Sequence, residues 1–476
     1  MDATKLTAEV WAGLGGDDAD LRRLTITGPA HVLPSVFPAT AVATATVAAA
    51  TLGVARLWRP GGGPDALPQV AVDTRHAAIA CHSERYVEVV GHDLGELWSS
   101  IAGVYAAADG WIRLHTNFRA HRRAALATLG LDDDGDPRPD RSAVGTAVAR
   151  WKAVDLEDAI YAAGGCAAAL RSADEWLASE PAAAVGAQPL VAITPLGDAP
   201  HPGPKASSPG NGPLAGLRVL DLTRSIAGPV AGRFLAAYGA DVLRIDAPPG
   251  DDSRILIADT TVGKRSALLD LHDPAAREQF EQLVADADVV LCAYRPGALD
   301  GLGYGPAALA ALRPGLVVAT LSAYGDRGPW GDRRGFDSLV QMATGIAEVG
   351  RCAAGSDTPV PLPVQLLDHA SGYLLAAGVA SALARRQAGG GSWHVRVALA
   401  RTATWLLGLP HTGALDVPGL PSELPDDVAV DLHGPLGHSR HVACPGAIVG
   451  AAPSWRSGPV PLGSSEIAFE NPHIAG

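Results

Sequence analysis

The residue with the clearest potential for chemistry is Asp368, which precedes a long apolar, helix-like segment. The surrounding stretch reads PLPVQLLDHASGY, so the carboxyl group is placed where a helix begins. An Asp at a helix N-cap accepts backbone N–H bonds and lies at the positive end of the helix dipole, so we expect it to stay ionised. Two roles fit such a carboxylate. It is either a structural cap or a nucleophile held against a carbonyl carbon, where effective concentration compensates for its weakness in water.

Other chemistries lack their motifs. No GxGxxG follows the apolar run at 217–222, which argues against a dinucleotide site. The GKRS sequence at 263–266 lacks the spacing of a P-loop, and no GxSxG nucleophile elbow occurs. Four potential metal ligands lie close together near the end of the chain: His433, His438, His441 and Cys444. Their spacing matches no standard zinc pattern, so we interpret the histidines as loop residues and expect no metal.

The elements that must position Asp368 can be predicted from alternating patterns between 214 and 409. Short apolar runs that read as strands lie at 217–222, 241–245, 288–293 and 316–322. Helix-like segments lie at 229–238, 274–285 and 306–312, and each begins with a Pro, which the first helical turn tolerates. This alternation predicts an α/β fold, a Rossmann-like parallel sheet with helices on both faces. Ligands of such sheets bind at the carboxyl ends of the strands.

A helix, a GGG turn and a strand occur in the same order twice. The segment that starts at Asp368 continues through GGG at 389–391 into the strand HVRV. The segment that starts at Thr40 continues through GGG at 61–63 into the strand QVAV, at the same offset. Convergence of two Ala-rich helices is one explanation, but the shared turn and strand favour a duplication whose first copy has lost the acid. The uncharged run at 39–54 is shorter than the ~20 residues of a membrane span, so we expect a buried helix.

Two stretches rich in Gly and Pro divide the chain. Residues 198–213 are typical of a linker, and residues 410–476 predict an extended, mostly irregular tail that wraps another part of the fold. The predicted parts are 1–84, which holds the first copy of the repeat, then 85–197, the linker 198–213, the sheet-forming part 214–409 and the tail 410–476.

The composition excludes some partners. With 37 basic and 50 acidic residues the net charge is −13, which argues against nucleic-acid or membrane binding but permits a local basic pocket. Hydrophobic residues make up 47% of the chain, enough for a folded core. The five Cys form no CxxC pair, and the N-terminal residues mix acids and bases without an apolar run. We therefore expect a reduced, cytoplasmic protein without a signal peptide.

Residues 214–408 resemble a family III CoA-transferase, the group of formyl-CoA and carnitine-type CoA-transferases. Four ordered blocks carry the resemblance: LAGLRVLDLTRSIAGPVAGRFLAAYGADVLRIDAPPGDDSR from 214, GKRSALLDL from 263, YRPGALDGLG from 294 and SAYGDRGPW from 322. Residues 85–195 resemble the family's small domain and C-terminal segment, which normally follow the Asp-bearing half. The resemblance therefore implies a smaller α+β domain that comes first, and a remnant of a tandem duplication that assembles one complete transferase from a permuted chain.

The resemblance also assigns site residues. It makes Asp368 the nucleophile, and it implies that CoA binds along 214–409. Lys264 and Arg265 would supply cations for its phosphates, with Arg254 and Arg295 as further candidates, since Arg donates two hydrogen bonds to a phosphate. Each of these cations is otherwise a solvated surface charge.

Three further positions follow from the same resemblance. Gly228 and Gly232 flank a helix start where the backbone can approach the ligand, although both are equally explained as packing glycines. Tyr324, with Gly325 beside it, ends a strand where the family lines its cleft.

The implied activity is CoA transfer from an acyl-CoA donor to a small carboxylic acid. Asp368 would form a mixed anhydride and then an aspartyl-CoA thioester. The reaction uses coenzyme A and acyl-CoA as substrates and needs no metal and no permanently bound cofactor. Family members are interlocked homodimers, so a homodimer is expected.

Two alternatives remain. A 2-methylacyl-CoA racemase shares the fold but uses a G-H-D motif, and here the matching residues are Gly335, Phe336 and Asp337, of which Phe336 cannot carry a proton. A catalytically degenerate CoA-binding or partner subunit is the other. It is motivated by the permuted order, by a missing glycine-rich loop and by Ile226, an apolar residue where formyl-CoA transferase has Gln.

Overall fold

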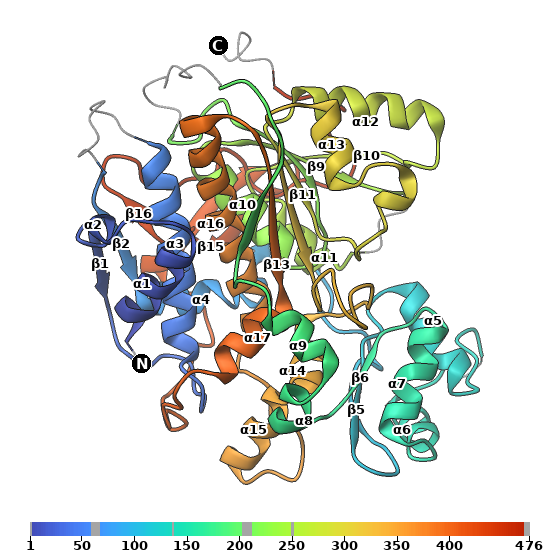
Figure 1. Cartoon of the computed structure of the whole chain (residues 1–476). Helices are drawn as coiled ribbons and strands as arrows, with labels where there is room; N and C mark the ends of the chain where they lie inside the picture. Colours follow the sequence, from blue (N-terminus) through green and yellow to red (C-terminus); the bar gives the residue numbers. More distant parts are fainter. Residues whose placement is uncertain (1, 59–66, 136–137, 202–211, 249–251, 471–476) are drawn as a thin grey trace.

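The protein has a mixed α/β fold built around one large sheet, with smaller sheets on either side (Figure 1). The computed structural model describes residues 2–58, 67–135, 138–201, 212–248 and 252–470. In Figure 1 the large sheet and its helices occupy the centre and top, the N-terminal helices lie to the left, and a separate lobe lies at the lower right. The predicted fold class is confirmed.

Seven strands form the large sheet, and six of them run parallel. In spatial order they are β10 (Arg265–Leu268), β9 (Asp241–Asp246), β8 (Arg218–Leu222), β11 (Val289–Cys292), β12 (Val317–Ser322), β13 (Ser392–Ala398) and β7 (Ala192–Gly197). β7 pairs antiparallel with β13 and closes that edge of the sheet. β8, β11 and β12 are almost entirely buried because helices cover both faces, which explains their unbroken apolar sequences.

Helices pack on both faces of the sheet, as the alternating sequence pattern predicted. One face carries α10 (Ala227–Ala237) and α16 (Leu366–Gly389), and the other carries α12 (Pro274–Asp286) and α13 (Pro306–Leu312). All the strands and helices predicted between 214 and 409 are present, with small shifts of their ends. The two faces have separate apolar cores, and the core under α10 and α16 continues into the N-terminal helices.

The two copies of the repeat pack against each other. α3 (Ala39–Leu57) lies along α16, and a Cβ added at Gly53 would meet that of Ala380 at 2.9 Å, so the backbones approach closely. Both helices are long and apolar enough to cross a membrane, but 89% of the α3 window and all of the α16 window are buried in the protein. The predicted buried helix is confirmed. Its Thr hydroxyls bond to carbonyls one turn back, for example Thr44 Oγ1 to Thr40 O at 2.8 Å.

The strands that follow the two helices belong to different sheets. β13 follows α16 in the large sheet, whereas β2 (Val70–Asp73) pairs with β1 (Leu24–Thr27) and with β16 (Ala447–Ile448). The first GGG turn, at 61–63, lies outside the described residues. The helix-then-strand order of the predicted repeat is therefore present, while the sheet partners have diverged.

The region predicted as 85–197 has two structural parts. An antiparallel sheet of β4 (Gly103–Ala106), β5 (Trp111–Leu114) and β6 (Ala167–Ala169) forms the lobe with α5 (Arg119–Thr128), α6 (Arg141–Val148) and α7 (Ala153–Ala162). The next helices, α8 (Ala173–Leu177) and α9 (Glu180–Gly186), lead back to β7 in the large sheet. Of the predicted linker 198–213, residues 202–211 lie outside the described residues.

The tail is more ordered than predicted. A hairpin of β14 (Ala429–Gly434) and β15 (Gly437–Val442) pairs with β3 (Glu88–Val89), so the expectation of a mostly irregular tail is wrong for this part. The hairpin turns through the two residues between Gly434 and Gly437, which pair with each other. The rest wraps the large domain as predicted. For example, Trp455 Nε1 donates to the carbonyl of Arg233 at 2.8 Å.

The remaining elements connect or cover these parts. They are α1 (Ala3–Gly13), α2 (Asp18–Leu21), α4 (Thr74–Ala80), η1 (Ser83–Arg85), α11 (Arg254–Thr260), η2 (Asp300–Leu302), α14 (Asp337–Ala343), α15 (Ile346–Ala354), α17 (Leu399–Leu407) and η3 (Asp426–Val428).

Candidate active site

Asp368 lies in the first turn of α16 and not at its N-cap. The cap position is Gln365, and the helix begins with Leu366, whose N–H donates to Val364 O at 2.7 Å. The N-cap prediction for Asp368 is therefore wrong. The helix starts earlier because the chain already turns after Pro363, which leaves Asp368 as the third helical residue.

Asp337 takes the capping role from another helix. The backbone N–H of Asp368 donates to Asp337 Oδ2 at 3.0 Å, and Gln341 Nε2 donates to Asp337 Oδ1 at 2.5 Å. Gln341 in turn accepts from the N–H of Leu362 at 2.7 Å, so α14 and the start of α16 are tied together. Because Asp337 serves the backbone, the carboxyl group of Asp368 is left without a hydrogen bond from any described residue, although the residue is only 7% exposed.

Burial and neighbouring acids determine the charge of Asp368. Desolvation raises its pKa well above the usual Asp value, and the charges of Asp337 and Glu84 raise it further. Burial also raises the pKa of Asp337, to about 6, against the lowering effect of its hydrogen bonds. The expectation that the helix end keeps Asp368 fully ionised is thus not met. The group is a desolvated and comparatively basic carboxyl group.

A buried hydrogen bond between a glutamate of the N-terminal part and a histidine of α16 lies next to Asp368. His369 Nε2 contacts Glu84 Oε2 at 3.1 Å, and neither side chain is exposed. Beside it, Ser83 Oγ donates to Asp259 Oδ2 at 2.9 Å, and Arg233 contacts Asp259 at 2.7 Å. The short helix η1 therefore inserts two polar residues between α10, α11 and α16. Sequence reasoning missed this contribution because no pattern links residue 84 to residue 369.

Two neighbouring cavities border Asp368, and both are also lined by Phe118, Ser225 and Phe336. The aromatic cavity, of about 340 Å³, is the one lined by Trp98, His115 and Leu256. The arginine cavity, of about 310 Å³, is lined by Arg224, Arg295, Arg333 and Arg334. A carboxylate that borders both cavities can reach a carbonyl carbon whose hydrocarbon group lies in one cavity and whose leaving group lies in the other.

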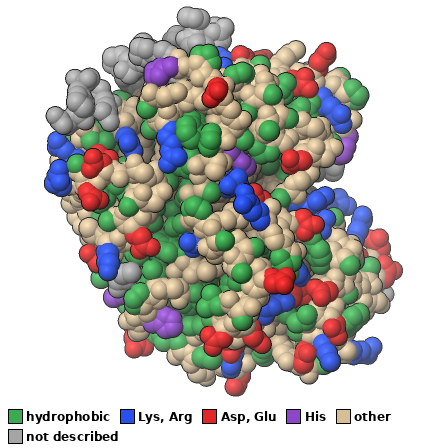
Figure 2. All heavy atoms as spheres, in the orientation of Figure 1, with side chains coloured by type: hydrophobic (Ala, Val, Ile, Leu, Met, Phe, Trp, Pro, Cys, Tyr) green, Lys and Arg blue, Asp and Glu red, His purple; other side chains and the backbone are tan. Residues whose placement is uncertain are grey.

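The lobe closes the aromatic cavity through the segment that follows β5. His115 stacks on Phe336 with ring centroids 3.7 Å apart and an interplanar angle of 4°. Asn117 holds the loop at 97–99 in place. Its Oδ1 accepts from Ser99 N at 3.0 Å, and its Nδ2 donates to Leu97 O at 3.0 Å. Figure 2 shows the hollow between this lobe and the large domain, with Lys and Arg side chains along the lobe's side.

Ser225 has an unusual backbone at the boundary between the cavities. Its φ is 65°, in the left-handed region that non-glycine residues rarely adopt. The turn brings the backbone between β8 and α10 against both cavities beside Asp368. Sequence reasoning identified the neighbouring Ile226, which lines the aromatic cavity, but not Ser225 itself.

Three of the predicted ligand-binding residues line the cavities. Arg254 lies on the wall of the aromatic cavity and is exposed. Arg295 is exposed and lines the arginine cavity together with a neighbouring strand-end cavity of about 480 Å³. Gly228 lines the arginine cavity and is also a packing glycine, since a Cβ there would lie 2.4 Å from Thr223 Cβ.

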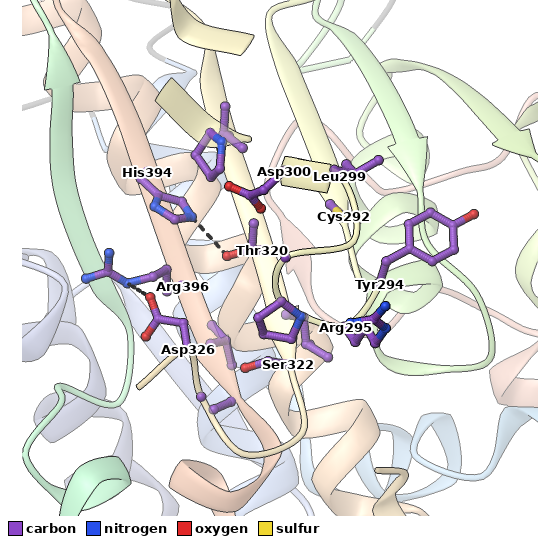
Figure 3. A pocket seen from close by; sticks show the side chains of 18 of the residues that line it. Cys292, Tyr294, Arg295, Leu299, Asp300, Thr320, Ser322, Asp326, His394 and Arg396 are labelled. Carbon is purple, nitrogen blue, oxygen red and sulfur yellow. Dashed lines mark hydrogen bonds and ion pairs between the residues drawn. The ribbon is translucent and has the colours of Figure 1, made fainter. Parts of the chain in front are cut away.

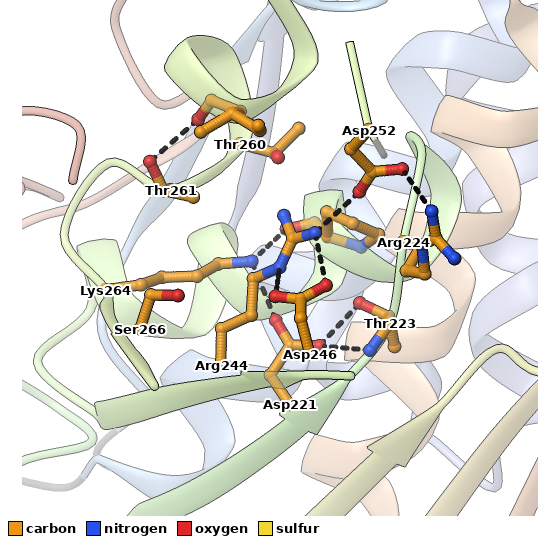
Figure 4. A network of polar contacts seen from close by, with 12 residues as sticks. Asp221, Thr223, Arg224, Arg244, Asp246, Asp252, Thr260, Thr261, Lys264 and Ser266 are labelled. Atoms are coloured by element: carbon orange, nitrogen blue, oxygen red, sulfur yellow. Dashed lines mark hydrogen bonds and ion pairs between the residues drawn. The ribbon is translucent and has the colours of Figure 1, made fainter. Parts of the chain in front are cut away.

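Lys264 is a structural residue, which corrects its assignment to phosphate binding. It is buried and donates to Asp221 Oδ2 at 2.8 Å and to Pro229 O at 2.9 Å (Figure 4). A Cβ at Gly232 would lie 2.8 Å from its Nζ, so that glycine makes room for the pair. In the same network Arg244 bridges Asp246 and Asp252, the latter at 2.6 Å. The ammonium group is thus satisfied inside the domain and lines neither of the cavities beside Asp368.

Arg265 and Tyr324 are also placed away from the cavities, so both assignments are corrected. Arg265 pairs with Asp241 at 2.7 Å and donates to the carbonyl of Ala468 in the tail, because β10 is the edge strand on which the tail lies. Tyr324 is 2% exposed and packs edge-on against Trp330 at 4.9 Å. Its neighbour Gly325 lines a different cavity.

The cavity that Gly325 lines, called the edge cavity here, has a volume of about 320 Å³ and lies at the ends of β12 and β13 (Figure 3). Asp368 does not line it. His394 Nε2 bonds to Thr320 Oγ1 at 2.9 Å, and Arg396 lies 3.7 Å from Asp326. Burial and Arg396 lower the pKa of His394 to about 4, so it is neutral near pH 7. Because Asp368 does not line it, this cavity is not part of the candidate site.

None of the clusters of His, Cys, Asp and Glu within the described residues is placed to hold a metal ion. Of the four ligands considered in the tail, His433 and His438 face each other across the β14–β15 hairpin with rings 5.0 Å apart.

The sheet-forming part of the chain is similar to known proteins. Residues 214–424 match the model of CoA-transferase family III. The probable fatty acyl-CoA transferase Rv3272 of Mycobacterium tuberculosis is 38% identical over 207 residues, which are 41% of this chain and 52% of that protein. The acetyl-coenzyme A transferase nodX of Hypoxylon pulicicidum is 31% identical over 323 residues, 64% of this chain and 54% of that protein.

A solved structure is also similar to part of this chain. The orthorhombic crystal structure of Rv3272 from M. tuberculosis is 38% identical and covers 41% of this chain and 56% of that chain, with a TM-score of 0.38. This chain spans about half the length of the curated relatives it matches.

Proposed function

We propose that this chain transfers CoA from an acyl-CoA to a carboxylic acid, with Asp368 as the nucleophile, because residues 214–424 match the model of CoA-transferase family III. One observation carries the proposal. The carboxyl group of Asp368 is buried and accepts no hydrogen bond from the described residues, and it borders two cavities at once. A structural acid in such a place would be hydrogen-bonded, as Asp337 is.

The reaction proceeds by two carbonyl exchanges. A carboxylate oxygen of Asp368 attacks the thioester carbon of the donor, the C–S bond breaks, and CoA leaves as the thiolate. The thiolate then attacks the Asp368 carbonyl carbon of the mixed anhydride, which releases the donor acid and leaves an aspartyl-CoA thioester. The acceptor carboxylate reverses these steps and regenerates Asp368. Each step has a lower barrier than direct exchange between a thioester and a free acid.

CoA has a suitable path on the arginine side of Asp368. The arginine cavity and the strand-end cavity share Arg224, Tyr294 and Arg295, so together they lead from Asp368 to the carboxyl ends of the strands. Guanidinium groups along this path are suited to phosphate oxygens. The pantetheine arm would lie in the arginine cavity, and the acyl group or the acceptor acid would lie in the aromatic cavity.

The alternatives are less well supported. A racemase of this fold would carry the His of the G-H-D motif, and the side chain at that position is the hydrocarbon ring of Phe336. A partner subunit that only binds CoA would not need an unpaired buried carboxyl group, which costs stability.

The test compares the parent protein with Asp368→Asn, which has nearly the same volume. With radiolabelled acyl-CoA and a panel of acids, the parent should exchange CoA and the variant should lose at least about a thousandfold in rate, since no bypass of the nucleophile exists. CoA binding by calorimetry should stay within about threefold, because the change removes no phosphate contact. Equal exchange rates would refute the assignment, and CoA binding without exchange in the parent would support the partner-subunit alternative.

A further inference from the structure

The edge cavity has polar walls of its own, and the proposed reaction does not use it. It adjoins the arginine cavity, because Arg295 and Ser322 line both. Its other walls come from the ends of β12 and β13, from the segment at 185–189 before β7, and from the segment at 294–309 that holds η2 and part of α13 (Figure 3). A molecule in this cavity therefore lies next to the proposed CoA path without contacting Asp368.

The charged residues of the wall leave one positive charge unbalanced. Three arginines and two aspartates line the cavity: Arg295, Arg396, Arg401, Asp300 and Asp326. Arg396 lies 3.7 Å from Asp326, and Arg295 and Asp300 are exposed to solvent. The remaining charge is the guanidinium group of Arg401, at the start of α17.

Arg401 is half-buried and has no acid as an ion-pair partner among the described residues. Its Nε donates to the backbone carbonyl of Gln188, which also lines the cavity, at 2.8 Å. Its terminal nitrogens bond to no described residue and are not sealed from solvent, so a ligand can reach them. Burial lowers the pKa of Arg401, and the charge of Glu9 offsets this effect only in part. An anion in the cavity would recover the cost of holding this cation partly out of water.

His394 presents a further polar atom to the edge cavity. The side chain is 8% exposed and lines this cavity but none of the other cavities described above. Its Nε2 bonds to Thr320 Oγ1, whereas its Nδ1 has no partner among the described residues. In contrast to the unpaired Nδ1 atoms of His369 and His441, this atom is not sealed from solvent. Water or a ligand in the cavity can therefore satisfy it.

The rest of the wall is mainly hydrocarbon. Leu299, Leu309 and Val318 line the cavity and are buried. The cavity has about 320 Å³, whereas a cavity of about 150 Å³ is sufficient for benzene, so it has room for a chain of about six to ten carbon atoms. Burial of such a chain contributes roughly 25 cal/mol per Å² of apolar surface.

We infer that the edge cavity binds a medium-chain carboxylic acid at a site separate from Asp368, with the carboxylate paired to Arg401 and the chain against the leucine wall. A guanidinium group is suited to a carboxylate because it donates two parallel hydrogen bonds. Binding at this site does not depend on the proposed CoA transfer, because Asp368 takes no part in it.

The first experiment compares octanoate with 1-octanol and octylamine, which have the same chain and a different charge. The net charge of the chain is −13, so the overall field of the protein disfavours octanoate and any advantage of this acid must be local. Measured by ligand-observed NMR, octanoate should bind at least about fivefold more tightly than either compound. Equal or tighter binding of 1-octanol or octylamine would overturn the proposal.

Spectra of protein labelled with ¹³C-histidine locate the bound acid. Octanoate should shift the ring signal of His394, assigned by its loss in His394→Phe, and the signal of His441, buried in the β14–β15 hairpin, should stay in place. His115 reports binding in the aromatic cavity independently. A shift of His115 without a shift of His394 would place the acid beside Asp368 and would overturn the proposal.

Variants test the cation. Arg401→Ala should weaken the binding measured at His394 by about tenfold and reduce the advantage of octanoate over 1-octanol to less than about twofold. Arg56→Ala is the matched control, because Arg56 also donates to one backbone carbonyl, Gly15 O at 3.2 Å, but lines none of the cavities described above. Should Arg401→Ala not fold, Arg401→Gln removes the charge and keeps most of the side chain. Unchanged affinity in the variant that folds would contradict the role of Arg401.

Coenzyme A separates this site from the proposed function. Octanoate should still shift His394 at saturating CoA, since the edge cavity and the CoA path share only a wall, and complete displacement by CoA would overturn the separate site. Octanoate binding at His394 in a protein that exchanges no CoA would support this site and refute the proposed function. Rapid CoA exchange without any shift of His394 would support the proposed function and refute this site.

Discussion

Two carboxyl groups lie at the start of α16: that of Asp337, which belongs to α14, and that of Asp368. Their roles differ because their hydrogen-bond partners differ. Asp337 is fully engaged with backbone and side-chain donors, whereas Asp368 faces the cavities without a donor from the described residues. The sequence was sufficient to single out Asp368 as the candidate nucleophile. It was not sufficient to predict the cap supplied by Asp337, because that contact depends on how α14 packs against α16 and no local pattern encodes it.

The pH dependence of exchange follows from these partners. Burial, Asp337 and Glu84 all raise the pKa of Asp368, so its reactive ionised form is lost at a higher pH than for an ordinary Asp of about 3.9. We expect kcat/KM to fall as the pH decreases, with a midpoint well above that value, and to level off at higher pH. Rate measurements between about pH 4.5 and 8.5 will show the midpoint.

A variant tests the cause of that shift. Asp337→Asn removes the nearest negative charge and should move the midpoint to lower pH, while Glu348→Gln, a partly exposed acid paired with Arg351, should leave it in place. A parent midpoint near the ordinary Asp value, or one that does not respond to Asp337→Asn, would show that the environment of Asp368 differs from this description.

Measurements of CoA binding can distinguish between two of the cations that the sequence assigned to phosphate binding. Arg295 is exposed, lines the arginine and strand-end cavities and has no partner within the described residues, whereas Arg265 is held by Asp241 at the far edge of the sheet. Arg295→Ala should therefore weaken CoA binding by about tenfold, roughly 1.4 kcal/mol, and Arg265→Ala by less than about twofold. Calorimetric titration with CoA measures both. Equal losses in the two variants would argue against the proposed CoA path.

At the scale of elements, the repeating strands and helices were readily predicted, because apolar periodicity directly reflects burial in a parallel sheet. Two elements were not. The β14–β15 hairpin lies in a stretch rich in Gly and Pro, where the alternation is short. The helix η1 has only three residues, and its importance depends on contacts with α10, α11 and α16.

The hydrogen bond between Glu84 of η1 and His369 should be important for stability. Replacing Glu84 by Ala leaves His369 buried without its partner, and the loss of a buried hydrogen-bond partner costs about 1–3 kcal/mol. Urea unfolding of Glu84→Ala should show this loss in the free energy of unfolding. Glu88→Ala, an exposed acid on the adjacent β3, should stay within about 0.5 kcal/mol of the parent. Equal stabilities of the two variants would mean that η1 does not support α16.

At the scale of the whole molecule, the site combines three distant parts of one chain. Glu84 comes from the N-terminal part, His115 from the lobe, and Asp368 from the large domain. α3 packs on α16 within the same chain, so the two copies of the repeat are already paired. The sequence predicted a repeat and a permuted order. That α3 and α16 share one core could only be seen once the helices were placed.

This arrangement predicts that one chain contains a complete site. Specific activity should stay constant as the protein is diluted from micromolar to nanomolar concentration, because all the residues assigned to the proposed site lie in one chain. Light scattering at the same concentrations will give the mass and will test the homodimer expected from the family resemblance. Activity that falls in parallel with dissociation would show that a second copy completes the site.

The covalent state of Asp368 tests the central claim most directly. After brief exposure to an acyl-CoA and quenching with hydroxylamine, peptide mass spectrometry should find a hydroxamate on the peptide containing Asp368, and it should be absent without acyl-CoA and absent in Asp368→Asn. A parent protein that exchanges CoA rapidly yet shows no modification of Asp368, or shows it on another residue, would contradict the nucleophilic role assigned to this side chain.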